Sequence, residues 1–140
     1  MQEINRVLRP IRGWIAMLSI LALTPACTSK VKADYRAFMK SYLAINQYAP
    51  IAERRKRIED LARVELETPE ARQTRDLCVK AHHRWADAKE AEAVYDAMKR
   101  SNDEGEKNGL DAWQAATSEA AGLLDRCREA YVQLEQKALR

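Results

Sequence analysis

The amino-acid sequence predicts an all-α protein, an antiparallel three-helix bundle that follows an N-terminal signal peptide. Three observations support this prediction: 23 of the 140 residues are alanine, glycine and proline number only four each, and apolar residues recur at three- and four-residue steps. With 46% hydrophobic and 32% charged residues, the composition is typical of a folded chain rather than a disordered one. A chain of this length has room for one core.

The first 26 residues have the layout of a secretory signal. Three arginines among the first 12 residues precede an apolar run from Trp14 to Leu23, and small residues follow it. The uncharged window between Arg12 and Lys30 is 17 residues long and ends in polar residues. A membrane-spanning helix needs about 20 predominantly apolar residues, so a cleaved signal is favoured over a permanent anchor.

The segment Leu23-Thr24-Pro25-Ala26-Cys27 resembles the lipobox of bacterial lipoproteins, which is a family of signals rather than of folds. The resemblance implies that Cys27 is acylated and becomes the first mature residue, which attaches the protein to a membrane. Ala26 fits the pattern, whereas Thr24 stands where an aliphatic residue is usual and Pro25 is uncommon at its position. Ordinary cleavage after Ala26, with a soluble secreted product, therefore stays open.

The lipobox resemblance also implies a location and a division of the chain. Thr28 follows the cysteine, which in this family favours the outer membrane over the inner one. We therefore expect a signal peptide at 1–26, a lipidated tether at 27–30 and a helical bundle domain at 31–140. The protein would be anchored in the bacterial cell envelope and would face the periplasm.

The mature part of the chain contains two helical segments before residue 68. The first, about Ser29–Ala49, carries one apolar stripe, and Pro50 either ends or kinks it. The second, about Ile51–Glu67, keeps its apolar residues on one side, namely Ile51, Ile58, Leu61 and Ala62. The three-helix prediction treats these segments as one long helix that is broken at Pro50.

Two longer helical segments follow. Thr68 is expected as the N-cap of a helix that begins at Pro69 and runs to about Arg100. Its two apolar stripes place it in the middle of the bundle. The polar residues 101–109 form a loop, and the last helix runs over about Leu110–Leu139. Ser101-Asn102-Asp103-Glu104 also has the pattern of a capping box, which predicts a helix start at Ser101.

Three cysteines leave an even pair if Cys27 is acylated, and an oxidising compartment then favours a disulfide between Cys78 and Cys127. In an antiparallel hairpin, facing positions have a constant sum, which for this pair puts the turn between Asn102 and Asp103. A turn centred on Gly105 would slip the register by about 7.5 Å of helical rise. Two buried free thiols are the alternative.

The candidate site residues are few. Arg54, Arg55, Lys56 and Arg57 form the densest basic run, which is either an anion-contact patch or a solvated helix face. Cys78, His82 and Cys127 are the only candidates for a metal site or a thiol enzyme, and a disulfide would use two of them. His82 and His83 are interpreted as a partly buried pair, with Asp87 as the partner of His83. Trp85 and Trp113 are interpreted as packing anchors.

These patterns favour a non-enzymatic structural or interaction module without a metal or cofactor, because no phosphate, dinucleotide, calcium or hydrolase motif occurs. Expected partners are the membrane, through the lipid, and an envelope protein or cell-wall component. Nucleic acid is excluded by export and by the lack of an aromatic platform beside the basic run. Most of the +3 net charge lies in the signal segment, so charge says little about the partner.

Overall fold

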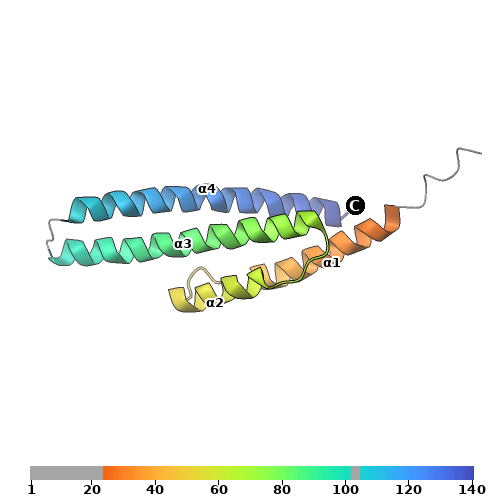
Figure 1. The fold of residues 1–140 in the computed structure, drawn as a ribbon, viewed down its shortest axis with the longest axis horizontal. Helices are drawn as coiled ribbons and strands as arrows, with labels where there is room; N and C mark the ends of the chain where they lie inside the picture. The colour runs from red at the N-terminus through yellow and green to blue at the C-terminus, as the bar shows by residue number, and fades with distance from the viewer. Residues whose placement is uncertain (1–23, 102–104) are drawn as a thin grey trace, which may run out of the picture.

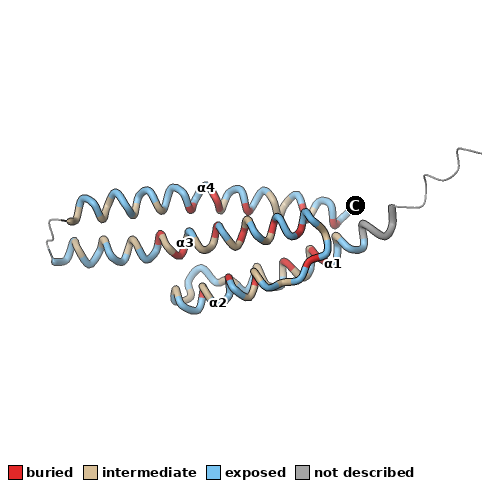
Figure 2. Tube along the Cα trace, viewed as in Figure 1, coloured by how far each residue is buried: buried red, intermediate tan, exposed pale blue. Residues whose placement is uncertain are grey.

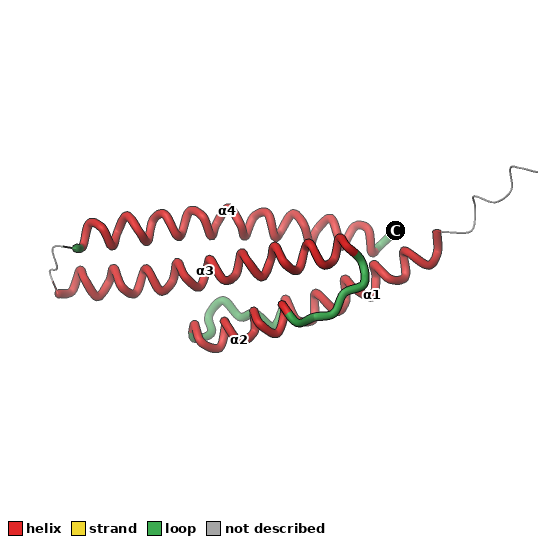
Figure 3. Tube along the Cα trace, in the orientation of Figure 1, coloured by secondary structure: helices red, strands yellow, loops and turns green. Residues whose placement is uncertain are grey.

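The computed structural model describes residues 24–101 and 105–140, with side chains from Ser29 onward. These residues form four helices, α1 (Thr24–Tyr42), α2 (Ile51–Ala62), α3 (Pro69–Ser101) and α4 (Glu106–Ala138) (Figure 1). The two described ranges contain no strand, so the all-α prediction is confirmed (Figure 3). Most of the predicted signal peptide, residues 1–23, lies outside the described residues, as does the side chain of Cys27.

The α3 and α4 helices form a long antiparallel hairpin, and the two shorter helices pack on only one part of it (Figure 1). The α3 helix contacts the other three helices, whereas α4 contacts α1 and α3. Buried residues gather on the covered part of the hairpin (Figure 2). None of the described residues between 89 and 119 is buried. Within the described part of the chain, the arm of the hairpin next to residues 102–104 therefore consists of two helices that pack on each other.

The first half of the chain differs from the predicted long helix. The α1 helix starts at Thr24, so residues 27–30 are helical, and it ends at Tyr42 instead of Ala49. Residues 43–50 form turns, in which the Tyr48 amide donates to the Asn46 side chain at 2.9 Å. The chain reverses through this loop, and α2 then runs antiparallel to α1 (Figure 1). Pro50 precedes α2 as its N-cap residue.

The connection from α2 to α3 is extended, and two arginines of α3 hold it by hydrogen bonds to its carbonyl groups. The α2 helix ends at Ala62 instead of Glu67. Arg75 donates to the Val64 carbonyl at 2.8 Å, and Arg72 donates to the carbonyls of Leu66 and Glu67 at 3.1 and 2.8 Å. These arginines satisfy carbonyl groups that would otherwise need helical or sheet partners. The start of α3 at Pro69 agrees with the sequence prediction.

The start of α4 differs from both sequence-based expectations. The helix begins at Glu106, about one turn before the predicted Leu110. The capping-box prediction at Ser101 is wrong, because Ser101 is the last residue of α3 and its hydroxyl donates to the Met98 carbonyl at 2.9 Å. The next helix starts only at Glu106, with Gly105 as its N-cap residue.

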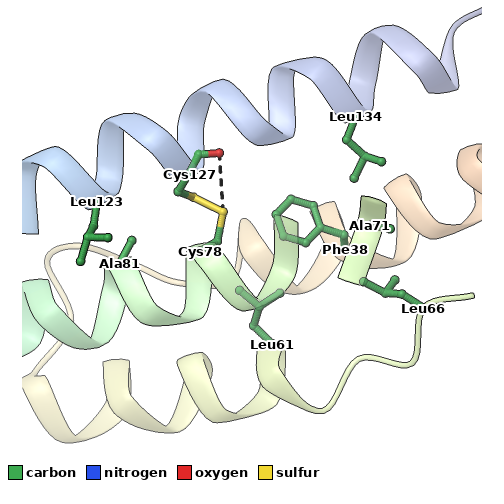
Figure 4. Packing of buried hydrophobic residues seen from close by; sticks show 9 residues of the cluster. All are labelled: Phe38, Leu61, Leu66, Ala71, Cys78, Ala81, Leu123, Cys127 and Leu134. Atoms are coloured by element: carbon green, nitrogen blue, oxygen red, sulfur yellow. Dashed lines mark hydrogen bonds between the residues drawn. A yellow bond between two sulfur atoms is a disulfide. The ribbon is translucent and has the colours of Figure 1, made fainter. Parts of the chain in front are cut away.

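The core lies where α1 and α2 cover the hairpin (Figure 4). Phe38 of α1 and Leu61 of α2 are completely buried, and they pack with α3 and α4 residues around a disulfide between Cys78 and Cys127. The two sulfur atoms are 2.06 Å apart and the Cα atoms 4.8 Å apart. This pairing agrees with the register expected from the sequence. None of the described helices is both long enough and apolar enough to cross a membrane.

Candidate functional site

A pocket of about 210 Å³ lies at the junction of all four helices. The ends of α1 and α2, the loop between them and the middle of the α3–α4 hairpin each contribute part of its wall. Its lining residues are Tyr42, Ile45, Gln47, Arg54, His82, Trp85 and Leu124. The pocket therefore combines an apolar and aromatic wall with two basic side chains.

Arg54 is the most unusual residue of this pocket, because its side chain is a buried cation. It is only 3% exposed and lies on the inward face of α2 with Ile58 and Leu61, which follow at helical spacing. Its Nε donates to the Asn46 carbonyl at 3.3 Å, and its Nη2 donates to the Gln47 carbonyl. The guanidinium carbon lies 3.7 Å from the centre of the Trp85 ring. These contacts fix the guanidinium against the loop and α3.

The positive charge of Arg54 is incompletely compensated. Its Nη1 is buried and has no hydrogen-bond partner among the described residues. No carboxylate among residues 29–101 and 105–140 forms an ion pair with it, although several other arginines of the chain have such partners. Burial lowers the pKa of the Arg54 guanidinium, but an arginine stays protonated in proteins. The cation–π contact and two carbonyls offset part of a desolvation cost of several kcal/mol.

His82 supplies a second unpartnered nitrogen to the same pocket. Its Nε2 is buried without a hydrogen-bond partner, and its ring contacts Tyr42 edge-on at a centroid distance of 5.5 Å. Burial, together with the charges of Arg54 and His83, lowers the pKa of His82 to about 4. His82 is therefore neutral at physiological pH. The expected His83–Asp87 pair is replaced by a contact between His83 Nε2 and Glu59 at 3.4 Å.

The basic run predicted from the sequence does not lie on one face. Arg54 points inward, whereas Arg55 bridges Asp87 and Glu90 on α3 at 2.9 and 3.0 Å. Arg57 pairs with Asp60 on its own helix at 3.6 Å, and Lys56 is exposed. The four residues thus have different surroundings, and only Arg54 combines burial with an unpartnered donor.

The residues considered for metal or thiol chemistry have different roles in the structure. The sulfur atoms of Cys78 and Cys127 are bonded to each other, so neither is a free thiolate. His82 faces the pocket instead. Across the described part of the chain, no group of three His, Cys, Asp or Glu side chains is placed to hold a metal ion.

Trp85 separates this pocket from a second one of about 230 Å³, which lies toward the two-helix arm. Lys89 lies 5.3 Å from the centre of the Trp85 ring. Trp113 lines the second pocket and stacks on Tyr95 at 5.6 Å. Both tryptophans, expected as core anchors, are only partly buried and form pocket walls.

The sequence patterns did not predict the pocket, although the position of Arg54 in α2 was an indication of it. Position 54 falls three residues after Ile51 and four before Ile58, so the helical period of α2 already places Arg54 on the apolar side. A basic residue on an apolar face indicates a buried partner or an unfilled site. Comparison with known proteins adds no further guide, because no known family, curated protein or solved structure matches this chain.

Proposed function

We propose that this protein is a small lipoprotein of the bacterial cell envelope that acts by binding rather than by catalysis. The observation that carries the proposal is the disulfide between Cys78 and Cys127. Stable disulfides are typical of oxidising compartments such as the periplasm. The pairing accounts for two of three cysteines and leaves Cys27, the cysteine of the lipobox-like segment, available for acylation.

The arrangement of the helices supports a role in binding. In this proposal, the signal peptide 1–26 directs export, and α1 and α2 pack on the α3–α4 hairpin to complete a four-helix bundle. The bundle holds an open pocket with a buried arginine. The two cysteines that could have served a thiol enzyme are bonded to each other. The tether at Cys27 would keep the bundle at the membrane facing the periplasm, with the outer membrane favoured.

A soluble secreted binding or chaperone-like protein is the second candidate. It is favoured by Thr24 and Pro25, which depart from the lipobox pattern and leave ordinary cleavage after Ala26 open. The pocket would have the same use in both cases, and only the membrane attachment would differ.

Replacing Cys27 with serine tests the tether. We expect the wild-type chain to fractionate with membranes and the Cys27→Ser variant to lose this association, because an acyl chain is the proposed anchor. Mass spectrometry of the mature N-terminus should show an acylated Cys27. Cys78→Ser and Cys127→Ser, made together, form the matched control, since they remove cysteines without removing the attachment site.

Two results would reject the lipoprotein proposal. An unmodified N-terminus at Cys27 in the soluble fraction would instead support the secreted protein. Membrane association that persists in Cys27→Ser would assign the anchor to another segment.

A further inference from the structure

We propose that the pocket between Arg54 and His82 binds the carboxylate of a small acid whose body is apolar. The juxtaposition that carries this inference is a 97% buried arginine whose Nη1, and a histidine whose Nε2, have no hydrogen-bond partner among the described residues, both residues lining one open pocket. Binding of such an acid in the pocket does not depend on the membrane tether.

The charge of the pocket requires an anion. A buried guanidinium without a counter-ion is costly, and removal of water strengthens its attraction for a negative ligand. Two acidic side chains of α3, Asp87 and Glu90, are already paired with Arg55. Glu59 contacts His83 rather than Arg54. A bound carboxylate would supply the missing partner.

A carboxylate has two oxygens, one for each of the two unpartnered nitrogens. Arg54 Nη1 carries two N–H groups, and the neutral His82 ring donates from Nε2 in the corresponding tautomer. The other Arg54 donors are occupied by the carbonyls of Asn46 and Gln47, which hold the guanidinium in place before a ligand arrives. Such preorganisation lowers the entropic cost of binding. Stabilising the loop and binding an anion therefore use different atoms of the same side chain.

The pocket favours a carboxylate with an apolar body over a phosphate. It offers one positive charge, which balances a monoanion but leaves a phosphate dianion with an uncompensated charge in a partly desolvated site. The remaining wall is mostly apolar and aromatic, formed by Tyr42, Ile45, Trp85 and Leu124. Its volume of about 210 Å³ exceeds the roughly 150 Å³ of an engineered apolar cavity that accepts benzene. An aromatic ring bearing one carboxylate therefore fits the pocket in size and chemistry.

Benzoate is a direct probe, and benzamide is its neutral control of nearly the same shape. Calorimetry on the full-length chain in detergent, with the disulfide intact and in a buffer without carboxylates, should show saturable binding of one benzoate with a dissociation constant below about 1 mM. Benzamide and phenyl phosphate should each bind at least about 10-fold more weakly, because benzamide is neutral and phenyl phosphate carries a second negative charge. The His82 ring resonances should shift with benzoate.

Substitutions assign the binding to the pocket. Arg54→Gln should weaken benzoate binding at least about 10-fold, and His82→Leu should weaken it several-fold by removing one donor. Arg57→Gln, on the exposed side of the same helix, should bind as the wild type does. If Arg54→Gln fails to fold, the wild-type comparison of benzoate with benzamide and the His82→Leu variant still test the proposal.

Three results would overturn it. Benzamide binding as tightly as benzoate would show an apolar pocket without anion recognition. Phenyl phosphate or inorganic phosphate binding more tightly than benzoate would assign the site to phosphates. Absence of saturation up to about 20 mM benzoate would show that Arg54 serves the loop alone.

Discussion

Asp34 shows how one buried carboxylate joins two distant parts of the chain. It lies on α1 and is 5% exposed. One oxygen accepts from the Glu67 amide at 3.0 Å, and the other accepts from the Thr68 amide and hydroxyl at 2.7 and 2.6 Å. Burial raises the pKa of Asp34, but these hydrogen bonds and the charge of Arg72 outweigh it, so the pKa lies below 3.8. Asp34 therefore fastens the connection that leads into α3.

Asp34→Asn should destabilise the protein by about 1–3 kcal/mol, because the amide leaves one oxygen to accept from three donors and turns its own NH₂ group toward them. Urea denaturation at neutral pH measures the loss. Asp125→Asn, an exposed change on α4, is the matched control and should leave the midpoint unchanged.

The same residue predicts an acid dependence of stability. A carboxyl whose pKa is lower in the folded state stabilises the fold above its ordinary pKa of 3.8, and this contribution is lost as the pH falls below that value. The stability difference between wild type and Asp34→Asn should therefore shrink in acid. A difference that stays constant down to pH 2 would show that the charge of Asp34 is unimportant.

At the scale of elements, α4 contains two glycines in different surroundings. A Cβ at Gly109 would lie 2.9 Å from Met98 Sδ and 3.7 Å from the Cα of Tyr95, because α3 and α4 approach closely there. A Cβ at Gly122 would meet nothing within 4 Å. The first glycine belongs to the helix–helix contact of the arm, and the second has no packing role in the structure.

Gly122→Ala should stabilise the protein by about 0.5–1 kcal/mol, since alanine restricts the unfolded chain and fits the helix interior without a clash. Gly109→Ala should give a smaller gain, because the Met98 side chain must move to make room. Thermal denaturation of both variants provides the comparison. A larger gain at Gly109 than at Gly122 would contradict the packing described for the arm.

At the scale of the whole molecule, stability is concentrated at one end of the hairpin. The disulfide joins α3 to α4 across a sequence separation of 49 residues, among the buried side chains that α1 and α2 cover (Figure 4). In the arm beyond residue 88, the described residues up to 119 are partly buried or exposed (Figure 2). Tyr95 and Trp113, which stack on each other there, are both partly buried. The cross-link therefore lies among the most deeply buried side chains of the hairpin.

Reduction of the disulfide should lower the free energy of unfolding by about 4 kcal/mol, because opening a loop of this length restores entropy to the unfolded chain. Denaturant unfolding of the oxidised and reduced protein measures the difference. A Cys78→Ala/Cys127→Ala variant should resemble the reduced protein. Equal midpoints for oxidised and reduced chains, or two reactive thiols at these positions in unreduced protein, would contradict the pairing.

Much of the helical architecture could be predicted because its signals are local. Pro69 starts α3 as expected, and Cys78 faces Cys127 as the hairpin register required. The end of α1 could not be predicted from the apolar stripe alone. That stripe continues to Ala49, but the chain turns after Tyr42, where α2 must return along the hairpin. A period of apolar residues does not show where tertiary packing ends a helix.

Local sequence signals were enough to predict a helical chain and the approximate positions of α3 and α4, and they favoured the Cys78–Cys127 pair over two free thiols, because these features depend on neighbours within a turn or on one hairpin register. Tertiary packing, in contrast, is what buries Arg54 beside His82 with no carboxylate partner among the described residues. The cost of burying a charge depends on atoms brought from Asn46, Gln47 and Trp85, which no local pattern around position 54 contains. The candidate site is consequently a property of the packing of four helices rather than of a motif.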